Sequence, residues 1–250
     1  MKTLNLITLT VLTGTLLTLT ARASVVGSPH DFSGPAGSSW NNDPADPKSV
    51  CSACHTPHHA DSSVIPLWSH ATTASTFKMY NTANVTALGD TATSLQATIA
   101  AQPNGPSKAC LSCHDGTVAI NTYGGVTVGG VGITITNSAN LGTDLTHSHP
   151  ISLTYDASIV GAGPNQDKWL YNPDTRTVLT PDNGTFVPGN DMTIKGFLLG
   201  ANHALECSSC HDVHNQEGTP FDINSNPKLV KINGTQGGVG SLLCRSCHNK

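Results

Sequence analysis

Eight cysteines, arranged as four pairs with a histidine directly after each pair, are the residues of this sequence with the most specific chemistry. The four motifs have the form C-x-x-C-H and occupy residues 51–55, 110–114, 207–211 and 244–248, and no cysteine lies outside them. Two thiols about one helical turn apart can each form a thioether with one vinyl group of a haem. The adjoining histidine then lies under the iron as its proximal ligand.

The spacing therefore predicts four covalently bound c-type haems. The predicted attachment residues are Cys51, Cys54, Cys110, Cys113, Cys207, Cys210, Cys244 and Cys247, and the predicted proximal iron ligands are His55, His114, His211 and His248. A disulfide scaffold and zinc sites are the alternatives for a chain with eight cysteines. A disulfide scaffold does not explain the histidine after every pair, and zinc sites place their histidines at wider spacing.

The ligand on the other side of each iron must come from elsewhere in the chain. Twelve histidines minus the four proximal ones leaves eight, whereas only Met79 and Met192 remain as methionines beyond residue 23. Two imidazoles on every iron is the economical interpretation, and it implies low reduction potentials and closed iron centres. The favoured distal ligands are His30, His58, His149 and His214, with His70 and His203 in reserve and His59 and His147 as neighbours that point elsewhere.

The elements that must position these residues are expected to be short. Residues 124–136 alternate apolar residues with glycine, which predicts a β-hairpin, and residues 175–188 contain a Pro-Asp-Asn-Gly turn that predicts a second one. Residues 91–101 are the best helix candidate outside the motifs. We expect a mostly coil, irregular multihaem cytochrome c fold with short helices at the haem motifs. Its core would be formed by the four haems, because aromatic residues make up only 5% of the chain.

Residues 1–23 are predicted to be a signal peptide, because Lys2 precedes an apolar run that ends in the small-x-small pattern Ala21-Arg22-Ala23. Residues 24–250 would then form a single tetrahaem domain in which ten basic residues face 16 acidic ones, a net charge of −6. A membrane anchor is the alternative for the first segment, and no later segment approaches spanning length. The acidic balance makes a nucleic-acid partner unexpected.

The strings CSACHTPHH, PLWSH, CLSCHDGTVAI, HPISLTY, CSSCHDVH and LCRSCH resemble the doubled-CXXCH multihaem c-type cytochromes of metal-reducing and related bacteria. Together with the SPHDF segment, the chain is most similar to the tetrahaem subunit of extracellular cytochrome filaments (the OmcE type). This resemblance implies a continuous stack of haems. It also implies that an N-terminal histidine of one subunit, here His30, ligates a haem of the next subunit. Ligation within its own chain is the alternative for His30.

These observations predict an electron carrier and not an enzyme. The first hypothesis is a subunit of an extracellular conductive filament, whose partners are copies of itself, other redox proteins and extracellular acceptors. The alternatives are a monomeric periplasmic electron shuttle and a multihaem reductase, which would need an open iron position. Charged residues are only 11% of the chain, which favours packing against copies of itself. The expected location is extracellular or on the cell surface, and alternatively the periplasm.

Overall fold

The structure is a computed structural model. It describes residues 25, 28–32, 50–61, 63–80, 97–163, 166–179, 192–214, 229–232, 235–236 and 239–249. The predicted signal peptide and residues 180–188 of the second predicted hairpin lie outside these ranges. Within them the chain is mostly irregular, with short helices and two-stranded sheets.

Three helices coincide with haem motifs. Helix α2 (Gly105–His114) ends with the second motif, α3 (Cys207–Cys210) spans the cysteines of the third, and α4 (Leu242–Cys247) ends with those of the fourth. Helix α2 has a proline in its first turn, where the missing N–H costs no hydrogen bond. The first motif forms a single turn, closed by the hydrogen bond from the His55 N–H to the Cys51 carbonyl (2.8 Å). The 3-10 helix η1 (Ala157–Ile159) and the π-helix η2 (Lys195–Leu199) lie between the second and third motifs.

The strands pair in three small antiparallel sheets. Strands β1 (Thr122–Tyr123) and β2 (Val126–Thr127) form a hairpin, as do β5 (Thr235–Gln236) and β6 (Val239–Ser241). Strand β3 (Leu153–Thr154) pairs with the distant β4 (Ala204–Leu205). In the first hairpin both turn residues, Gly124 and Gly125, have positive φ, which suits a tight two-residue turn.

Two local predictions were wrong in part. The hairpin predicted over residues 124–136 is formed by 122–127 instead, and residues 131–136 are not a strand. The helix predicted over 91–101 is absent from its described part, 97–101, where Ile99 forms a β-bridge with Leu153. Burial of Ile99 against the β3 region therefore outweighs the weak helix preference of this segment.

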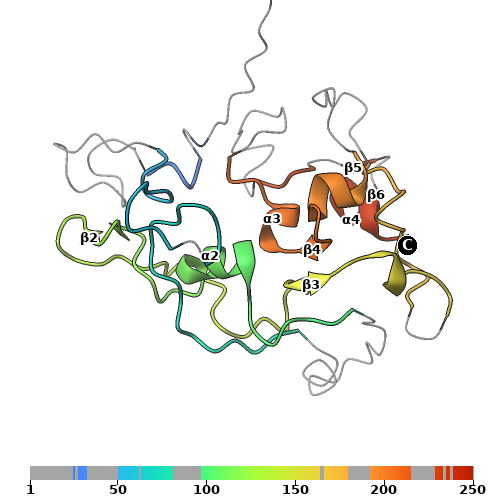
Figure 1. Ribbon diagram of the computed structural model, residues 1–250, viewed down its shortest axis with the longest axis horizontal. Helices are drawn as coiled ribbons and strands as arrows, with labels where there is room; N and C mark the ends of the chain where they lie inside the picture. Colours follow the sequence, from blue (N-terminus) through green and yellow to red (C-terminus); the bar gives the residue numbers. More distant parts are fainter. Residues whose placement is uncertain are drawn as a thin grey trace, which may run out of the picture.

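The N-terminal and C-terminal motifs occupy different halves of the molecule. Figure 1 shows α2 and the first hairpin on one side and α3, α4 and β4 to β6 on the other, and α2 contacts α3 where the halves meet. Among the residues that the structure describes, the buried apolar side chains form three clusters and no single core. A residue of a C-x-x-C-H motif lies in or against each cluster: Cys247 packs against the first, Leu111 belongs to the second, and Ala53 belongs to the third. Folding therefore gathers the apolar side chains around the motifs.

Candidate haem-binding sites

The backbone has the same hydrogen-bond arrangement around three of the four motif histidines. We call this arrangement the main-chain clamp. In the first motif the Thr56 N–H donates to the Leu67 carbonyl (2.8 Å), and the Ser69 N–H donates to the Cys54 carbonyl (3.0 Å). These two hydrogen bonds form a short antiparallel bridge centred on His55. The clamp holds the histidine backbone in place without using any side chain.

The third and fourth motifs have equivalent hydrogen bonds around His211 and His248. Written from N–H donor to carbonyl, they are Asp212 to Leu229 (2.8 Å), Lys231 to Cys210 (2.8 Å), Asn249 to Trp169 (2.6 Å) and Tyr171 to Cys247 (2.9 Å). In each clamp the residue opposite the histidine is apolar: Trp68, Val230 or Leu170. The second motif differs, because helix α2 continues to His114, whose carbonyl accepts from the Leu141 N–H (2.7 Å).

Hydrogen bonds to the side chains of two proximal histidines leave their Nε2 atoms available as ligands. The Nδ1 atom of His55 lies 3.0 Å from the Pro66 carbonyl oxygen, and that of His114 lies 2.8 Å from the Ala139 carbonyl oxygen. A carbonyl can only accept, so Nδ1 carries the proton and Nε2 keeps its lone pair. Metal-bound histidines are commonly oriented by such a bond.

Three proximal histidines each lie opposite a histidine from a distant part of the chain. The ring-centre distances are 6.1 Å for His55 and His214, 6.0 Å for His114 and His30, and 6.2 Å for His248 and His149. Every one of these pairs joins a motif histidine to a histidine outside the motifs. The pairs therefore have the composition expected for proximal and distal ligands of one iron.

The distances also have the expected size. A metal–imidazole bond is roughly 2.0 Å long and the ligating nitrogen lies about 1.1 Å from the ring centre, so two imidazoles on opposite sides of one iron have centres about 6.2 Å apart. The rings can turn about the bond axis without changing this distance, and the observed interplanar angles range from 17° to 73°. The spacing of all three pairs thus fits a haem iron between the rings.

The His30 side chain packs against residues of its own chain. Its ring is opposite His114, and burial together with the nearby charges of His114 and His211 lowers the pKa of His30 to about 4. This position is compatible with the intramolecular alternative. Ligation of a neighbouring subunit, which the resemblance implies, stays a prediction and would need His30 to leave this half-buried position.

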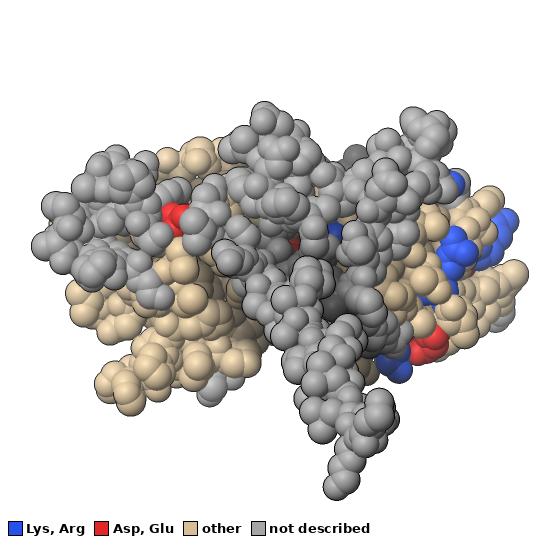
Figure 2. Space-filling model, turned by 90° about the horizontal axis from the view of Figure 1, so that it is seen from above, with Lys and Arg blue, Asp and Glu red and all other residues tan. Residues whose placement is uncertain are grey.

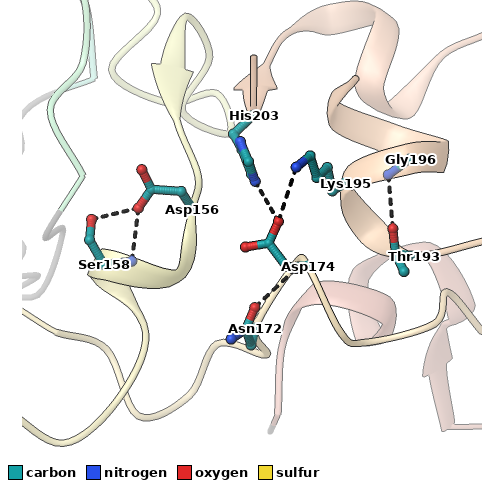
Figure 3. Close-up of polar contacts among 8 residues, drawn as sticks. All are labelled: Asp156, Ser158, Asn172, Asp174, Thr193, Lys195, Gly196 and His203. Atoms are coloured by element: carbon teal, nitrogen blue, oxygen red, sulfur yellow. Dashed lines mark hydrogen bonds and ion pairs between the residues drawn. The ribbon is translucent and has the colours of Figure 1, made fainter. Parts of the chain in front are cut away.

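The other candidate histidines have different surroundings. The Nε2 atom of His203 binds the Asp174 carboxylate at 2.8 Å, so the atom that would ligate iron is occupied (Figure 3). The His70 ring is buried between Trp68 and Tyr123, with ring-centre distances of 5.3 and 5.8 Å, and burial lowers its pKa. His58, His59 and His147 are exposed. Of the four favoured distal candidates, the described residues bring three opposite a proximal histidine, whereas no such ring contact is seen for His58.

Burial raises the pKa of the second thiol in every motif. The values are about 11 for Cys54 and Cys210 and about 12 for Cys113 and Cys247. All eight cysteines are free thiols in the structure, so the disulfide alternative is not seen. The second thiols thus lie in apolar surroundings, which suit contact with the apolar edge of a haem.

Serines within the motifs have a structural role that the sequence analysis missed. Ser112 and Ser246 are fully buried. Each donates to a carbonyl four residues earlier (2.8 and 2.9 Å) and accepts an N–H from a distant loop, that of Thr73 (2.9 Å) or Leu179 (2.8 Å). The sequence does contain a sign of this role, because the serine of the form C-x-S-C-H recurs in three of the four motifs.

The polar atoms around the motifs also fit a haem. Buried side-chain atoms without a hydrogen-bond partner among the described residues include Trp68 Nε1, His70 Nδ1 and Arg176 Nε. A buried donor normally has an acceptor, and haem propionates are carboxylates that could supply one. The described part of the chain contains no group of three or more His, Cys, Asp or Glu suited to a metal ion. A haem iron needs only two protein ligands, because the macrocycle provides the other four.

Comparison of the chain with protein-family models and with curated protein sequences finds no match. Among the helices that the structure describes, none combines the length and apolar character needed to cross a membrane.

Proposed function

We propose that this chain is an exported electron carrier with four c-type haems, each held by the thioethers of one C-x-x-C-H motif and by imidazoles on both faces. The observation that carries the proposal is the set of three histidine pairs, each joining a motif histidine to a distant one at 6.0 to 6.2 Å. When bound, each haem supplies an iron that exchanges one electron. A histidine on each side of an iron would leave no free position there for a substrate.

Contacts between the motifs support electron movement along the chain. The Cys54 thiol is close enough to Cys113 for their charges to interact, and Cys210 is similarly close to Cys247. Between these pairs, the thiols of Cys110 and Cys207 are hydrogen-bonded to each other, which raises the pKa of Cys110 and lowers that of Cys207 to about 7. Haems attached to these sulfurs would lie next to one another in the order of their motifs along the chain. Each haem would then have a close neighbour, as a four-haem relay requires.

The finer proposal is that the protein is a subunit of an extracellular conductive filament that delivers electrons to external acceptors. It is supported by the resemblance to filament cytochromes and by the low charge content, 11% of all residues. One observation favours the alternative of a monomeric periplasmic shuttle: the half-buried ring of His30 lies beside His114 of the same chain. A filament of this chain would then rest on contacts other than a His30–iron bond.

Mass spectrometry of the denatured native protein tests the cofactor. The expected mass is that of residues 24–250 plus four haems, with no free thiol. Absorption and electron paramagnetic resonance spectra of the oxidised protein should be low-spin throughout, because two imidazoles give a strong ligand field. A haem-free chain with disulfides would refute the proposal, and a large high-spin fraction would favour a reductase.

Electron microscopy of wild-type protein and of His30→Ala distinguishes the assemblies. Filaments in both samples, with one high-spin haem in the variant, would indicate a filament in which His30 acts within its own chain. Filaments in the wild type alone would indicate a ligand exchanged between subunits. Single particles in the wild-type sample would favour the shuttle.

A further inference from the structure

Residues 170–179 form a segment that is attached to the fourth haem motif at both of its ends. At one end the Tyr171 N–H donates to the Cys247 carbonyl (2.9 Å), as part of the main-chain clamp. At the other end the Leu179 N–H donates to the buried Ser246 hydroxyl of α4 (2.8 Å). Both ends of the segment therefore lie beside the fourth motif, while its middle pairs with residues 192–194, where the Ile194 N–H donates to the Arg176 carbonyl (2.8 Å) and the Val178 N–H to the Met192 carbonyl (2.9 Å).

Arg176 is the cation of this segment, and part of its side chain is buried. Its guanidinium carbon lies 4.2 Å from the centre of the Tyr171 ring, a cation–π contact. Its Nε atom is buried and has no hydrogen-bond acceptor among the described residues. Tyr171 belongs to the clamp around His248, so the guanidinium is placed beside the fourth motif with an N–H that lacks an acceptor.

The nearest carboxylate in the sequence does not supply that acceptor. Asp174 binds His203 Nε2 at 2.8 Å and Lys195 Nζ at 3.3 Å, and Figure 3 shows its carboxylate pointing toward these two side chains. Figure 2 shows lysine and arginine side chains gathered at the end of the molecule that holds the C-terminal half. The described cations of that half are Lys168, Arg176, Lys195, Lys231 and Arg245. An anionic group beside the fourth motif would therefore find Arg176 available.

We propose that Arg176 is a positioning residue that binds a propionate of the fourth haem and raises the reduction potential of that haem relative to the other three. The inference rests on the proposed function. An oxidised haem carries one more positive charge than a reduced haem, so a partly buried cation beside it destabilises the oxidised form. Hydrogen bonds and charge close to a haem are among the features by which a protein sets its potential.

The test is a redox titration of the full holoprotein, in which paramagnetic NMR signals of the haem methyl groups report each haem separately. Arg176→Gln removes the charge and keeps much of the side-chain volume, whereas Arg176→Lys keeps the charge. Lys168→Gln is the matched control. Lys168 is an exposed cation, its Nζ 5.1 Å from the Trp169 ring centre, and it precedes the same clamp, but its charge is screened by water.

In Arg176→Gln the electron equilibrium should shift about tenfold away from the fourth haem, a fall of about 59 mV in its potential alone. Lys168→Gln should leave all four potentials unchanged, and Arg176→Lys should keep most of the wild-type value. Unchanged potentials in Arg176→Gln, an equal fall in Lys168→Gln, or an equal fall in Arg176→Lys would overturn the inference. Four low-spin haems in every variant would leave the proposed function intact, and a chain without haem would refute that function first.

Discussion

Replacing His149 by alanine should leave one of the four haems without its distal ligand. The His149 ring lies opposite that of His248, with 6.2 Å between the ring centres, and its Nδ1 lies 3.0 Å from the Pro150 carbonyl oxygen, which leaves Nε2 as the ligating atom. Since each iron is expected to have one distal imidazole, about a quarter of the haem should become high-spin. The other three quarters should stay low-spin, because each of those irons is expected to have a distal histidine other than His149.

The assay is the absorption and electron paramagnetic resonance spectrum of the oxidised variant, before and after addition of free imidazole. Imidazole should restore the low-spin signal, because the substitution leaves room for a ring of the same size beside the iron. The control is His147→Ala, which changes an exposed histidine two residues away in the same loop. A fully low-spin His149→Ala protein, or an equal loss in His147→Ala, would refute the assignment of His149 as a ligand.

Three further predictions concern other parts of the sites. Ser246→Ala should lower the free energy of unfolding by about 1–3 kcal/mol in denaturant titrations, because it leaves the partly buried Leu179 N–H without its acceptor, whereas the exposed Ser208→Ala should have little effect; equal losses would contradict this reasoning. His203→Gln should keep four low-spin haems, since its Nε2 is already bound to a carboxylate, and a new high-spin signal would show it to be a ligand. Because burial lowers the pKa of His30 to about 4, its neutral ring persists as the pH falls, and the low-spin spectrum should be unchanged from pH 7 to 5; loss of a quarter of that signal at pH 5 would count against this.

Local features of the structure could be predicted from the sequence. The position of short helices at the motifs follows from the cysteine spacing, and the glycine-rich alternation after residue 124 indicated a hairpin close to the observed one. Both depend on residues within a few positions of one another. The predicted extent of that hairpin was wrong, and so was the helix predicted over residues 97–101, where Ile99 instead pairs with the distant Leu153.

The pairing of the histidines could not be predicted, although three of the four favoured distal candidates lie opposite a proximal histidine. His55 and His214 are far apart in the sequence, and no periodic pattern connects them. The resemblance to filament cytochromes implies that His30 ligates a haem of another subunit, which stays a prediction; within the chain its ring lies beside that of His114. The buried serines were missed for a similar reason, because the loops that they bind lie far from the motifs in the sequence.

The main-chain clamp has a consequence for how such a protein can evolve. Its hydrogen bonds join only N–H and carbonyl groups, and the residues that supply them at equivalent positions, such as Leu67, Leu229 and Trp169, need not be alike. Substitutions in these loops therefore leave the backbone hydrogen bonds intact as long as the chain keeps its course. At these clamp positions the course of the backbone matters more than the identity of the side chain. Two descendants of one ancestor could thus keep the same haem sites after almost all detectable sequence similarity between them has been lost.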